Sequence, residues 1–518
     1  MSEPLGTPSA EGGERIVAER VEKLHALREQ GVEPFAYGYD PTHGATAARE
    51  LFDRWEAGAK GEGEEGPAER VRLAGRVVAK RVMGKSTFVH LADRTGRIQL
   101  YFRVNDLADT YPLLDLVDLS DWVGAEGSLF RTRTGEVSLR VTSFQLLAKA
   151  IRPLPLGKEE IDAETGERRV YSGFSDVEAR YRQRYADLAV NPEVREVFVL
   201  RARIVSALRR FLDERGFVEV ETPILQPLYG GAAARPFTTL HNALDMQLYL
   251  RIADELYLKR LIVGGLERVY EIGKDFRNEG IDRFHNPEFS MLEFYAAYLD
   301  YEGVMALTEE LLGYVAREAL GGTVAAFGEH SIDFGAPFRR YTMYEALREV
   351  GGVDVERLSD EEMAAKVRSL GVSAADVATM GRGKLIDELF GELVEPKLVQ
   401  PTFITDYPRE MSPLAKTKRG NPELTERFEL IVAGKELCNA YSELNDPIDQ
   451  RERFEAQAGL RARGDEEAQQ LDEDFIRALE YGMPPTGGFG MGVDRLTMIL
   501  ANQPSIRDVI LFPTMRPE

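Results

Sequence analysis

The sequence contains only one cysteine, Cys438, among its 518 residues. A single cysteine excludes an internal disulfide and any metal site built from several cysteines, and it suits a reducing compartment. No stretch approaches the roughly 18 consecutive apolar residues of a membrane-spanning helix. The amino-terminal segment MSEPLGTPSAEGGE has neither a basic leader nor an apolar run, so we expect no secretory signal. These absences predict a cytoplasmic protein without a membrane partner.

Acidic residues are nearly missing from one segment of an otherwise acidic chain. The net charge of the whole sequence is −22, which argues against a nucleic-acid partner. Between Arg70 and Arg103, however, there are nine basic residues and one acid, Asp93. This run is either a solvated face or a surface for a polyanion, and its one-sidedness favours the polyanion.

The first part of the chain changes its pattern twice. Residues 1–69 combine helical patterns with a Gly/Glu-rich stretch at 57–69, which predicts a helical extension and a flexible linker. Residues 70–150 alternate apolar and polar positions between turn signals. Several short strands in that length fit an OB-fold barrel, a common reader of single-stranded nucleic acid. The aromatic residues interleaved with its basic residues are Phe88, Tyr101, Phe102 and Phe130.

The rest of the chain mixes helices with longer strands. We predict a linker at 151–185 and a larger domain at 186–518. Helical patterns lie at 194–216 and 493–500, and strand patterns lie at 268–276, 288–295, 427–433 and 436–443. Antiparallel strands with helices outside them predict an α+β fold.

The candidate chemistry lies in three segments of this domain, 205–227, 268–295 and 487–500. In the second segment, alternation places Phe289, Glu293 and Tyr295 on one face of a strand. In the third, a glycine-rich strand lets a ligand approach the backbone, and Arg495 lies in the first turn of the helix that follows. Arg277, in the charged loop of the second segment, complements Arg495, because two arginines on separate elements suit a polyanion held at both ends.

A pair of acids is suited to Mg²⁺. Glu429 and Glu436 flank a predicted turn at Ala433-Gly434, so their side chains can meet across a hairpin. Magnesium commonly takes one or two carboxylates together with phosphate oxygens. Any one of these charged residues could instead belong to a surface salt bridge. Their position among apolar strand neighbours favours a site.

These segments resemble motifs 1, 2 and 3 of the class II aminoacyl-tRNA synthetases, with FRNEG in the second and GxGxDR in the third. Within that class, the chain resembles the lysyl-tRNA synthetases. The matching stretches are GGAAARPF (230–237), LRIADELYLKR (250–260), RNEGI…HNPEF (277–289) and YSELNDP (441–447). The resemblance implies an N-terminal OB-fold β-barrel joined to an antiparallel-sheet catalytic domain. It also implies a homodimer that activates L-lysine with ATP and transfers it to tRNA(Lys), with no DNA partner.

The resemblance assigns roles by matching positions. ATP would contact Arg277, Glu279, His285, Phe289 and Arg495, with Arg277 and Arg495 as the catalytic arginines. Lysine would contact Gly231, Glu255, Arg277, Glu293, Tyr295, Asn439, Tyr441 and Glu443. Mg²⁺, bound with ATP and expected as more than one ion, would contact Glu429 and Glu436. The anticodon would contact Arg81, Phe88, Gln99 and Glu136.

Substrate charge separates lysine from the nearest rivals. Aspartyl- and asparaginyl-tRNA synthetases share the architecture, but an aspartate pocket must present cations to a side-chain carboxylate. The acids Glu255, Glu293 and Glu443 suit a substrate with two ammonium groups instead. A short relative that lysylates a translation factor lacks the barrel. A further alternative, an RNA-binding paralogue with a dead core, would have lost the ATP-contacting arginines or the Mg²⁺ acids, and none is missing.

Overall fold

The structure is a computed structural model that describes residues 10–58, 65–161, 168–171, 173–378, 380–462 and 470–517. The chain divides into two units, Met1–Pro192 and Glu193–Glu518, and each unit is described by itself. Among the described residues, no helix combines the length and the apolar character needed to cross a membrane.

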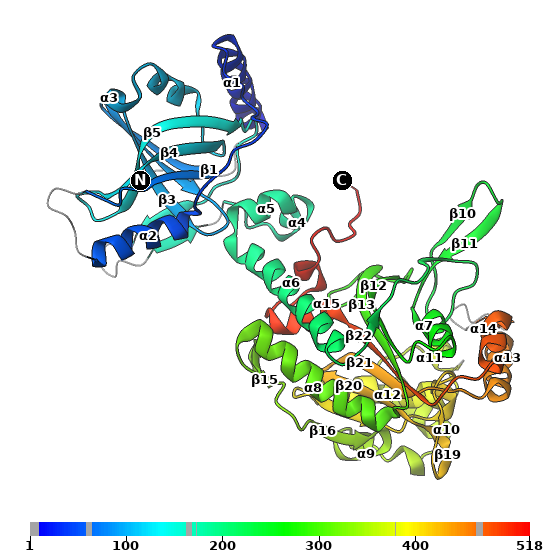
Figure 1. Ribbon diagram of the computed structural model, residues 1–518. Coiled ribbons are helices and arrows are strands. Elements are labelled where there is room, and N and C mark those ends of the chain that lie inside the picture. Colours follow the sequence, from blue (N-terminus) through cyan, green and yellow to red (C-terminus); the bar gives the residue numbers. More distant parts are fainter. Residues whose placement is uncertain are drawn as a thin grey trace. The chain divides into compact units, whose positions relative to one another are not determined.

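A closed β-barrel forms the body of the first unit, with the strand order β1-β2-β3-β5-β4 (Figure 1). Its strands are β1 (Arg70–Met83), β2 (Ser86–Ala92), β3 (Arg97–Arg103), β4 (Trp122–Arg131) and β5 (Val137–Ala148). From Val71 to Val77 every second residue of β1 points inward, so Val71, Leu73 and Val77 are buried in the barrel. The predicted N-terminal barrel is confirmed.

Helices and a hairpin complete the first unit: α1 (Ala10–Glu29), α2 (Ala45–Ala57), α3 (Val104–Leu107), η1 (Ala108–Leu116), β6 (Lys158–Ile161), β7 (Arg168–Tyr171), α4 (Val177–Arg182) and α5 (Arg184–Val190). The ammonium of Lys149 is fully buried between Asp118 and Asp121, at 2.7 Å from each. Lys23 of α1 also binds Asp118, at 2.5 Å, which ties this helix to the barrel. The linker predicted at 57–69 falls partly on residues 59–64, which lie outside the described residues.

An eight-stranded sheet forms the centre of the second unit, in the order β16-β17-β20-β21-β22-β13-β12-β8. The strands are β8 (Val218–Glu219), β12 (Arg268–Phe276), β13 (Glu288–Ala297), β16 (Arg339–Thr342), β17 (Thr402–Thr405), β20 (Arg427–Val432), β21 (Lys435–Ser442) and β22 (Thr486–Gly492). Pairing is antiparallel except at the two edges, where β8 and β16 run parallel to their neighbours. The predicted α+β fold with an antiparallel catalytic sheet is confirmed.

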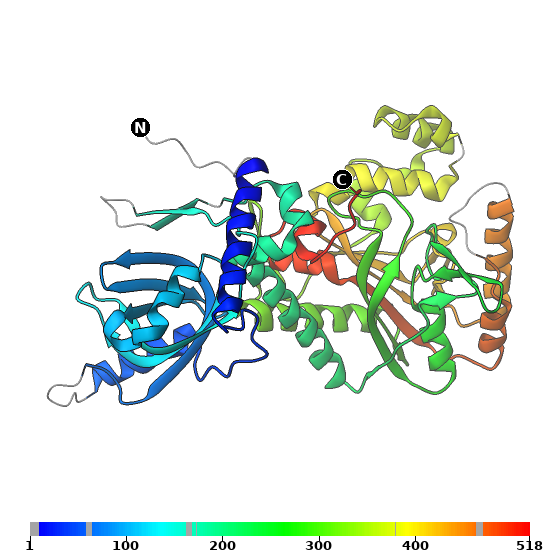
Figure 2. The same cartoon turned by 90° about the horizontal axis from the view of Figure 1, so that it is seen from above.

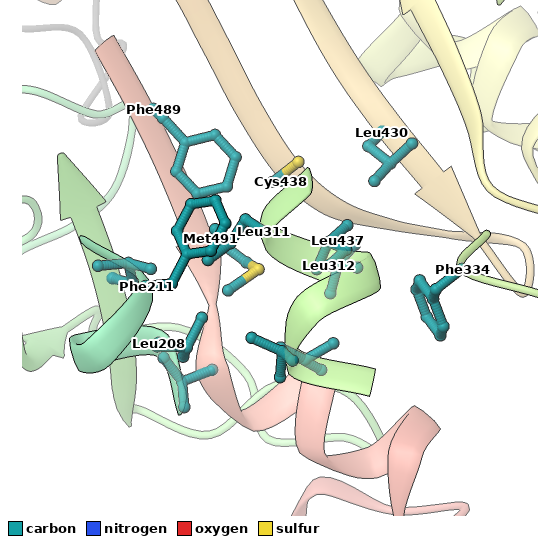
Figure 3. Packing of buried hydrophobic residues seen from close by; sticks show 14 of the residues in the cluster. Leu208, Phe211, Leu311, Leu312, Phe334, Leu430, Leu437, Cys438, Phe489 and Met491 are labelled. Atoms are coloured by element: carbon teal, nitrogen blue, oxygen red, sulfur yellow. The ribbon is translucent and has the colours of Figure 1, made fainter. Parts of the chain in front are cut away.

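Three helices cover one face of this sheet: α6 (Pro192–Asp213), α8 (Tyr301–Leu320) and α15 (Val493–Leu500). Figure 3 shows the core between them, where Phe489 and Met491 of β22 meet Phe211 of α6 and Leu311 of α8. The buried side chains of β13 on this face alternate with residues that point to the other face. The helical layer therefore leaves the opposite face of the sheet free for a site.

The remaining elements surround the sheet. They are β9 (Leu225–Gln226), β10 (Thr238–His241), β11 (Met246–Leu250), α7 (Glu255–Val263), β14 (Val324–Phe327), β15 (His330–Asp333), α9 (Met343–Glu349), η2 (Val355–Arg357), α10 (Asp360–Ser369), α11 (Ala374–Val377), α12 (Arg382–Leu393), η3 (Glu395–Lys397), η4 (Arg409–Met411), β18 (Thr417–Lys418), β19 (Asn421–Thr425), α13 (Pro447–Ala462), α14 (Glu473–Glu480) and α16 (Ile506–Val509). The helices between residues 343 and 393 share a core of their own and gather at one edge of the unit, in yellow-green in Figure 2.

Candidate active site

A cavity of about 450 Å³ lies on the sheet face that the three helices leave free. Strands β13, β20, β21 and β22, helix α7 and the loop that follows β12 contribute to its wall. All the residues predicted from sequence for ATP, lysine and Mg²⁺ line it: Gly231, Glu255, Arg277, Glu279, His285, Phe289, Glu293, Tyr295, Glu429, Glu436, Asn439, Tyr441, Glu443 and Arg495. The tertiary structure therefore brings together one set of residues from segments more than 250 positions apart.

One end of the cavity is rich in arginine and aromatic groups. The guanidinium of Arg277 lies 5.1 Å from the centre of the Phe289 ring, within the range of a cation–π contact. Arg495 donates to the carbonyl of Glu436 at 2.6 Å and to Nε2 of His285 at 3.1 Å. An arginine can only donate, so Nε2 of His285 must accept, and its Nδ1 carries the hydrogen that Asp282 receives at 2.8 Å. This end presents cations and a ring face, as a nucleotide requires.

The two predicted metal acids lie on neighbouring strands. Ala433 and Gly434 form the predicted turn, each with a positive φ (54° and 73°). A register shift after Leu430 leaves Glu429 opposite Asn439, and Glu436 opposite Ile431, yet both carboxylates face the cavity. Burial raises the pKa of Glu429 to about 7, a rise that Arg427 opposes and Glu436 increases. Glu429 pairs with Arg427 at 2.5 Å and Glu436 with Arg495 at 3.6 Å, and two carboxylates on one wall of the cavity fit a divalent cation.

The other end of the cavity is acidic. Glu255 begins α7 and Glu443 follows β21, and both carboxylates contact the ammonium of Lys259, which is fully buried. Burial raises the pKa of Glu443 to about 8, a rise that Lys259 opposes and Glu255 increases. Gly488 of β22 is required beside them, because an added Cβ would lie 1.9 Å from an oxygen of Glu443.

Glu293 lies at the same end and is buried. The hydroxyl of Tyr295 donates to one of its oxygens at 3.1 Å, and the backbone N–H of Asp254 donates to the other at 3.3 Å. Asp254 and Asp275 lie so close that one oxygen from each and one from Glu293 are within 4.8 Å of one another. Burial, with the carboxylates of Asp275 and Glu255 adding to it, raises the pKa of Glu293 well above its ordinary value. Such an acidic pocket is complementary to ammonium groups.

Between the two ends lie groups suited to an amino acid's backbone and stem. Asn439 accepts from Arg427 at 3.2 Å and donates to the hydroxyl of Tyr441 at 3.1 Å, so both side chains are held in place. Gly231 has a φ of +89°, and its Cα lies so close to Ala253 and Glu255 that an added Cβ would be 3.1 Å from each of their Cβ atoms. Only glycine combines this conformation with this approach.

Four charged residues of the site were missed by sequence reasoning. They are Arg251, Lys259, Arg427 and Asp494. Arg251 lies beneath the acidic end, paired with Asp254 at 2.7 Å, Glu271 at 2.6 Å and Asp275 at 3.2 Å. The carboxylate of Asp494 accepts the backbone N–H of Ser290 and pairs with Arg201 of α6. Asp494 belongs to the third motif, GxGxDR, although the sequence analysis gave it no role. Nothing in the local sequence distinguishes Arg251, Lys259 and Arg427 from surface charges.

The four predicted anticodon residues lie on the barrel. Phe88 is half-buried and stacks on Tyr101 with ring centres 4.8 Å apart, and Arg81 is its exposed cross-strand partner. Gln99 donates to Glu136 at 2.8 Å. Phe88 and Tyr101 give this face its stacking rings, whereas Gln99 is buried and also accepts from Ser138 at 2.9 Å, so both ends of its amide are paired within the barrel.

Two barrel residues, Phe102 and Lys80, do not contribute to the nucleic-acid surface that the sequence predicted. Phe102 is buried and meets Phe144 edge-on inside the barrel, so it is not available to stack on a base. Lys80 turns inward and donates to the carbonyls of Leu114 and Val117. The carbonyl of Leu114 also accepts the backbone N–H of Val117 at 3.1 Å, so Lys80 adds a second donor at the end of η1. The polyanion surface predicted from the basic run is therefore smaller than the run itself.

This fold and cavity define a class of protein. Residues 176–516 match the family model described as tRNA synthetases class II (D, K and N), and residues 71–147 match the model described as OB-fold nucleic acid binding domain. The chain is a class II tRNA synthetase by fold and by sequence.

Curated relatives narrow the class further. The lysine–tRNA ligase of Moorella thermoacetica is 54% identical over 97% of this chain and 98% of its own length. That of Christiangramia forsetii is 52% identical over 96% of this chain and 86% of its own length, and that of Halalkalibacterium halodurans is 50% identical over 100% and 98%. The chain belongs to the family of lysine–tRNA ligases, and the resemblance seen in the sequence is confirmed.

Proposed function

We propose that this protein activates L-lysine with ATP and transfers the lysyl group to the 3′ end of tRNA(Lys). The observation that carries the proposal is the cavity with two unlike ends. Arg277, Arg495 and Phe289 lie at one end, and Glu255, Glu293 and Glu443 lie at the other. A nucleotide triphosphate suits the first end and a substrate with two ammonium groups suits the second. An aspartate or asparagine substrate has no use for three buried acids.

The reaction requires positioning and charge stabilisation rather than an enzyme nucleophile. The lysine carboxylate attacks the α-phosphorus of ATP, and pyrophosphate leaves from the opposite side. Arg277 would bind the attacking carboxylate and the α-phosphate, while Phe289 stacks on adenine with Glu279 near the base. Arg495 would cover the other adenine face and reach the γ-phosphate. The terminal ribose hydroxyl of tRNA then attacks the lysyl carbonyl, and AMP leaves.

Lysine would lie across the acidic end of the cavity. Its α-ammonium would bind Glu255 and the backbone at Gly231, and its carboxylate would bind Asn439. Its ε-ammonium would bind Glu293 and Glu443, with Tyr295 beside it and Tyr441 packed on the alkyl stem. In this arrangement each ammonium of the substrate gains buried carboxylates as partners.

Glu429 and Glu436 are proposed to hold Mg²⁺, and more than one ion is expected with ATP. Their facing carboxylates fit an oxygen-preferring cation, and no other hard ligand is needed from the protein. When bound, Mg²⁺ would neutralise charge on the phosphates. His285, already oriented by Asp282, would lie near the outer phosphates.

Binding of the tRNA anticodon by the barrel is a proposal as well. The barrel face with Arg81, Phe88, Gln99 and Glu136 is proposed to read the anticodon, because it offers a ring to stack on and polar groups to read a base. The domain boundaries at 69, 150 and 185 and the cytoplasmic location stay predictions from the sequence.

A homodimer is proposed as well. Support comes from exposed apolar side chains that gather in the first motif and the hairpin β10–β11, which projects from the unit in Figure 1. They are Val218, Ile224, Leu225, Leu228, Leu240, Leu244 and Met246. Exposed apolar side chains that gather in one region support an interaction site there. Light scattering of the full chain should give twice the monomer mass, and a monomer mass would refute this assignment.

Pyrophosphate exchange tests the function directly. Exchange of labelled pyrophosphate into ATP should depend on lysine and on none of the other nineteen standard amino acids. Exchange driven by aspartate or asparagine would assign the chain to the rival synthetases. The absence of exchange with all amino acids would favour a core without activity.

A further inference from the structure

Lys259 is a buried ammonium that the proposed mechanism does not use. It lies on α7, one helical turn after Glu255, and none of its surface is exposed to solvent. Its Nζ donates to Glu255 at 2.5 Å and forms an ion pair with Glu443. It does not line the cavity, so the lysine substrate would not contact it. Burial of an ammonium costs free energy unless charged partners compensate for the lost water, and here the two carboxylates are those partners.

The charges that line the acidic end can be counted. Glu255, Glu293 and Glu443 contribute three negative charges when ionised, and Lys259 contributes one positive charge behind them. The sum is two negative charges. The proposed substrate presents two ammonium groups to this end, while its carboxylate lies toward Arg277 and Asn439. Among these four groups, the match in charge with the substrate requires Lys259, while the deeper carboxylates Asp254, Glu271 and Asp275 are paired with Arg251.

We propose that Lys259 is a positioning and specificity-determining residue. It holds Glu255 and Glu443 in place, and its positive charge adjusts the net charge of the acidic end so that it matches a substrate with two ammonium groups. This inference rests on the proposed function. The proposal assigns part of the selectivity for lysine to a residue that the substrate does not contact. Without the Lys259 ammonium, the two carboxylates repel each other and one must take up a proton before lysine binds.

Titratable groups from several elements face this cluster, while on the far side of α7 Arg260 pairs with Asp472 and Asp474 at the start of α14. From β13 these are Glu293 and Tyr295, from β20 and β21 they are Arg427 and Tyr441, and at the start of α7 and on β12 they are Asp254 and Asp275. Lys259 is the cation among the described residues that contacts both Glu255 and Glu443. Its replacement therefore changes the protonation of this pair more than any other single substitution nearby.

The test is Lys259→Met, measured by lysine-dependent pyrophosphate exchange between pH 6 and 10. In the unmodified protein, kcat/KM for lysine should rise with pH and level off once Glu443 is ionised. In the variant the rise should move to higher pH by about one unit or more, because the stabilising cation has gone. At pH 7.5 the value should fall about 100-fold, while the Kd of ATP without lysine changes less than about threefold. A merely structural role would lower activity without moving the pH profile.

Controls separate the possible failures. Lys418→Met removes another ammonium of the same unit, paired with Asp406 away from the cavity, and should leave the lysine pH profile in place. Lys259→Gln, a polar neutral replacement, provides the same measurement if the methionine variant does not fold. A pH profile that superimposes on that of the unmodified protein would overturn the role of Lys259. Absence of lysine-dependent exchange in the unmodified protein would instead overturn the proposed function.

Discussion

Replacing Glu293 by glutamine tests the lysine pocket most directly. The side chain is 5% exposed, and two donors converge on it, the N–H of Asp254 on one oxygen and the hydroxyl of Tyr295 on the other. Glutamine keeps the shape but offers one oxygen, so one of these donors loses its acceptor. A buried donor left without a partner costs ~1–3 kcal/mol of folding free energy. The empty protein should therefore fold with a modest loss of stability.

The loss of lysine binding should be larger than the loss of stability. Removal of one partner from a buried, hydrogen-bonded charge pair costs ~2–5 kcal/mol, which corresponds to roughly a 30- to 5,000-fold loss. Lysine kcat/KM in pyrophosphate exchange should fall by that factor, whereas the Kd of ATP without lysine should stay nearly constant. Discrimination against uncharged analogues of similar length should shrink. If Glu293→Gln activates lysine normally, the ε-ammonium lies elsewhere and the assignment of the pocket fails.

The pH dependence of stability gives an independent check of the same residue. The pKa of Glu293 is raised in the folded protein, so the unfolded chain ionises first as pH increases above about 4.5. Stability is therefore lost as pH rises between the unfolded and folded pKa values. Glu293→Gln removes this loss, so its melting temperature should fall less between pH 6 and pH 9 than that of the unmodified protein. An equal fall in both proteins would show that Glu293 is ionised in the empty pocket.

Other substitutions test the neighbouring parts of the site and the barrel. Gly488→Ala should displace the Glu443 carboxylate and lower lysine kcat/KM about 100-fold, whereas the Cβ of Gly490→Ala would lie 3.3 Å from the flexible end of Met291 and should leave that carboxylate in place. Glu436→Ala should abolish Mg²⁺-dependent pyrophosphate exchange without unfolding the protein, and an unchanged Mg²⁺ dependence would exclude it as a ligand. Arg81→Ala should reduce the salt dependence of tRNA binding by ~0.7–0.9 log units per tenfold salt for each phosphate that the arginine neutralises. Phe88→Ala should instead weaken binding by ~1–3 kcal/mol with little change in that slope, and identical behaviour of both variants would contradict the division between charge and stacking.

The sequence by itself predicted the barrel, several helices and strands of the larger domain, and the residues that line the cavity. Period-2 alternation is a local property of a strand, so it correctly placed Phe289, Glu293 and Tyr295 on one face of β13. The turn at Ala433-Gly434 was also predicted correctly, because two-residue hairpin turns with positive φ favour glycine, which is a local property of the sequence. The family motifs then named the members of the cavity, although their roles stay predictions.

Only the tertiary structure decided which charges are buried and which partners they have. Lys259 and Arg251 look like surface residues of a helix and a strand end, but they meet carboxylates from β12 and from the end of β21. Lys80 looks like part of a basic surface, but it turns to carbonyls of η1 and of the residue that follows it. Burial and ion pairing depend on segments that are distant in sequence, and the cost of burying a charge depends on what those segments supply. No local pattern contains that information, so the charge balance of the pocket became visible only in the fold.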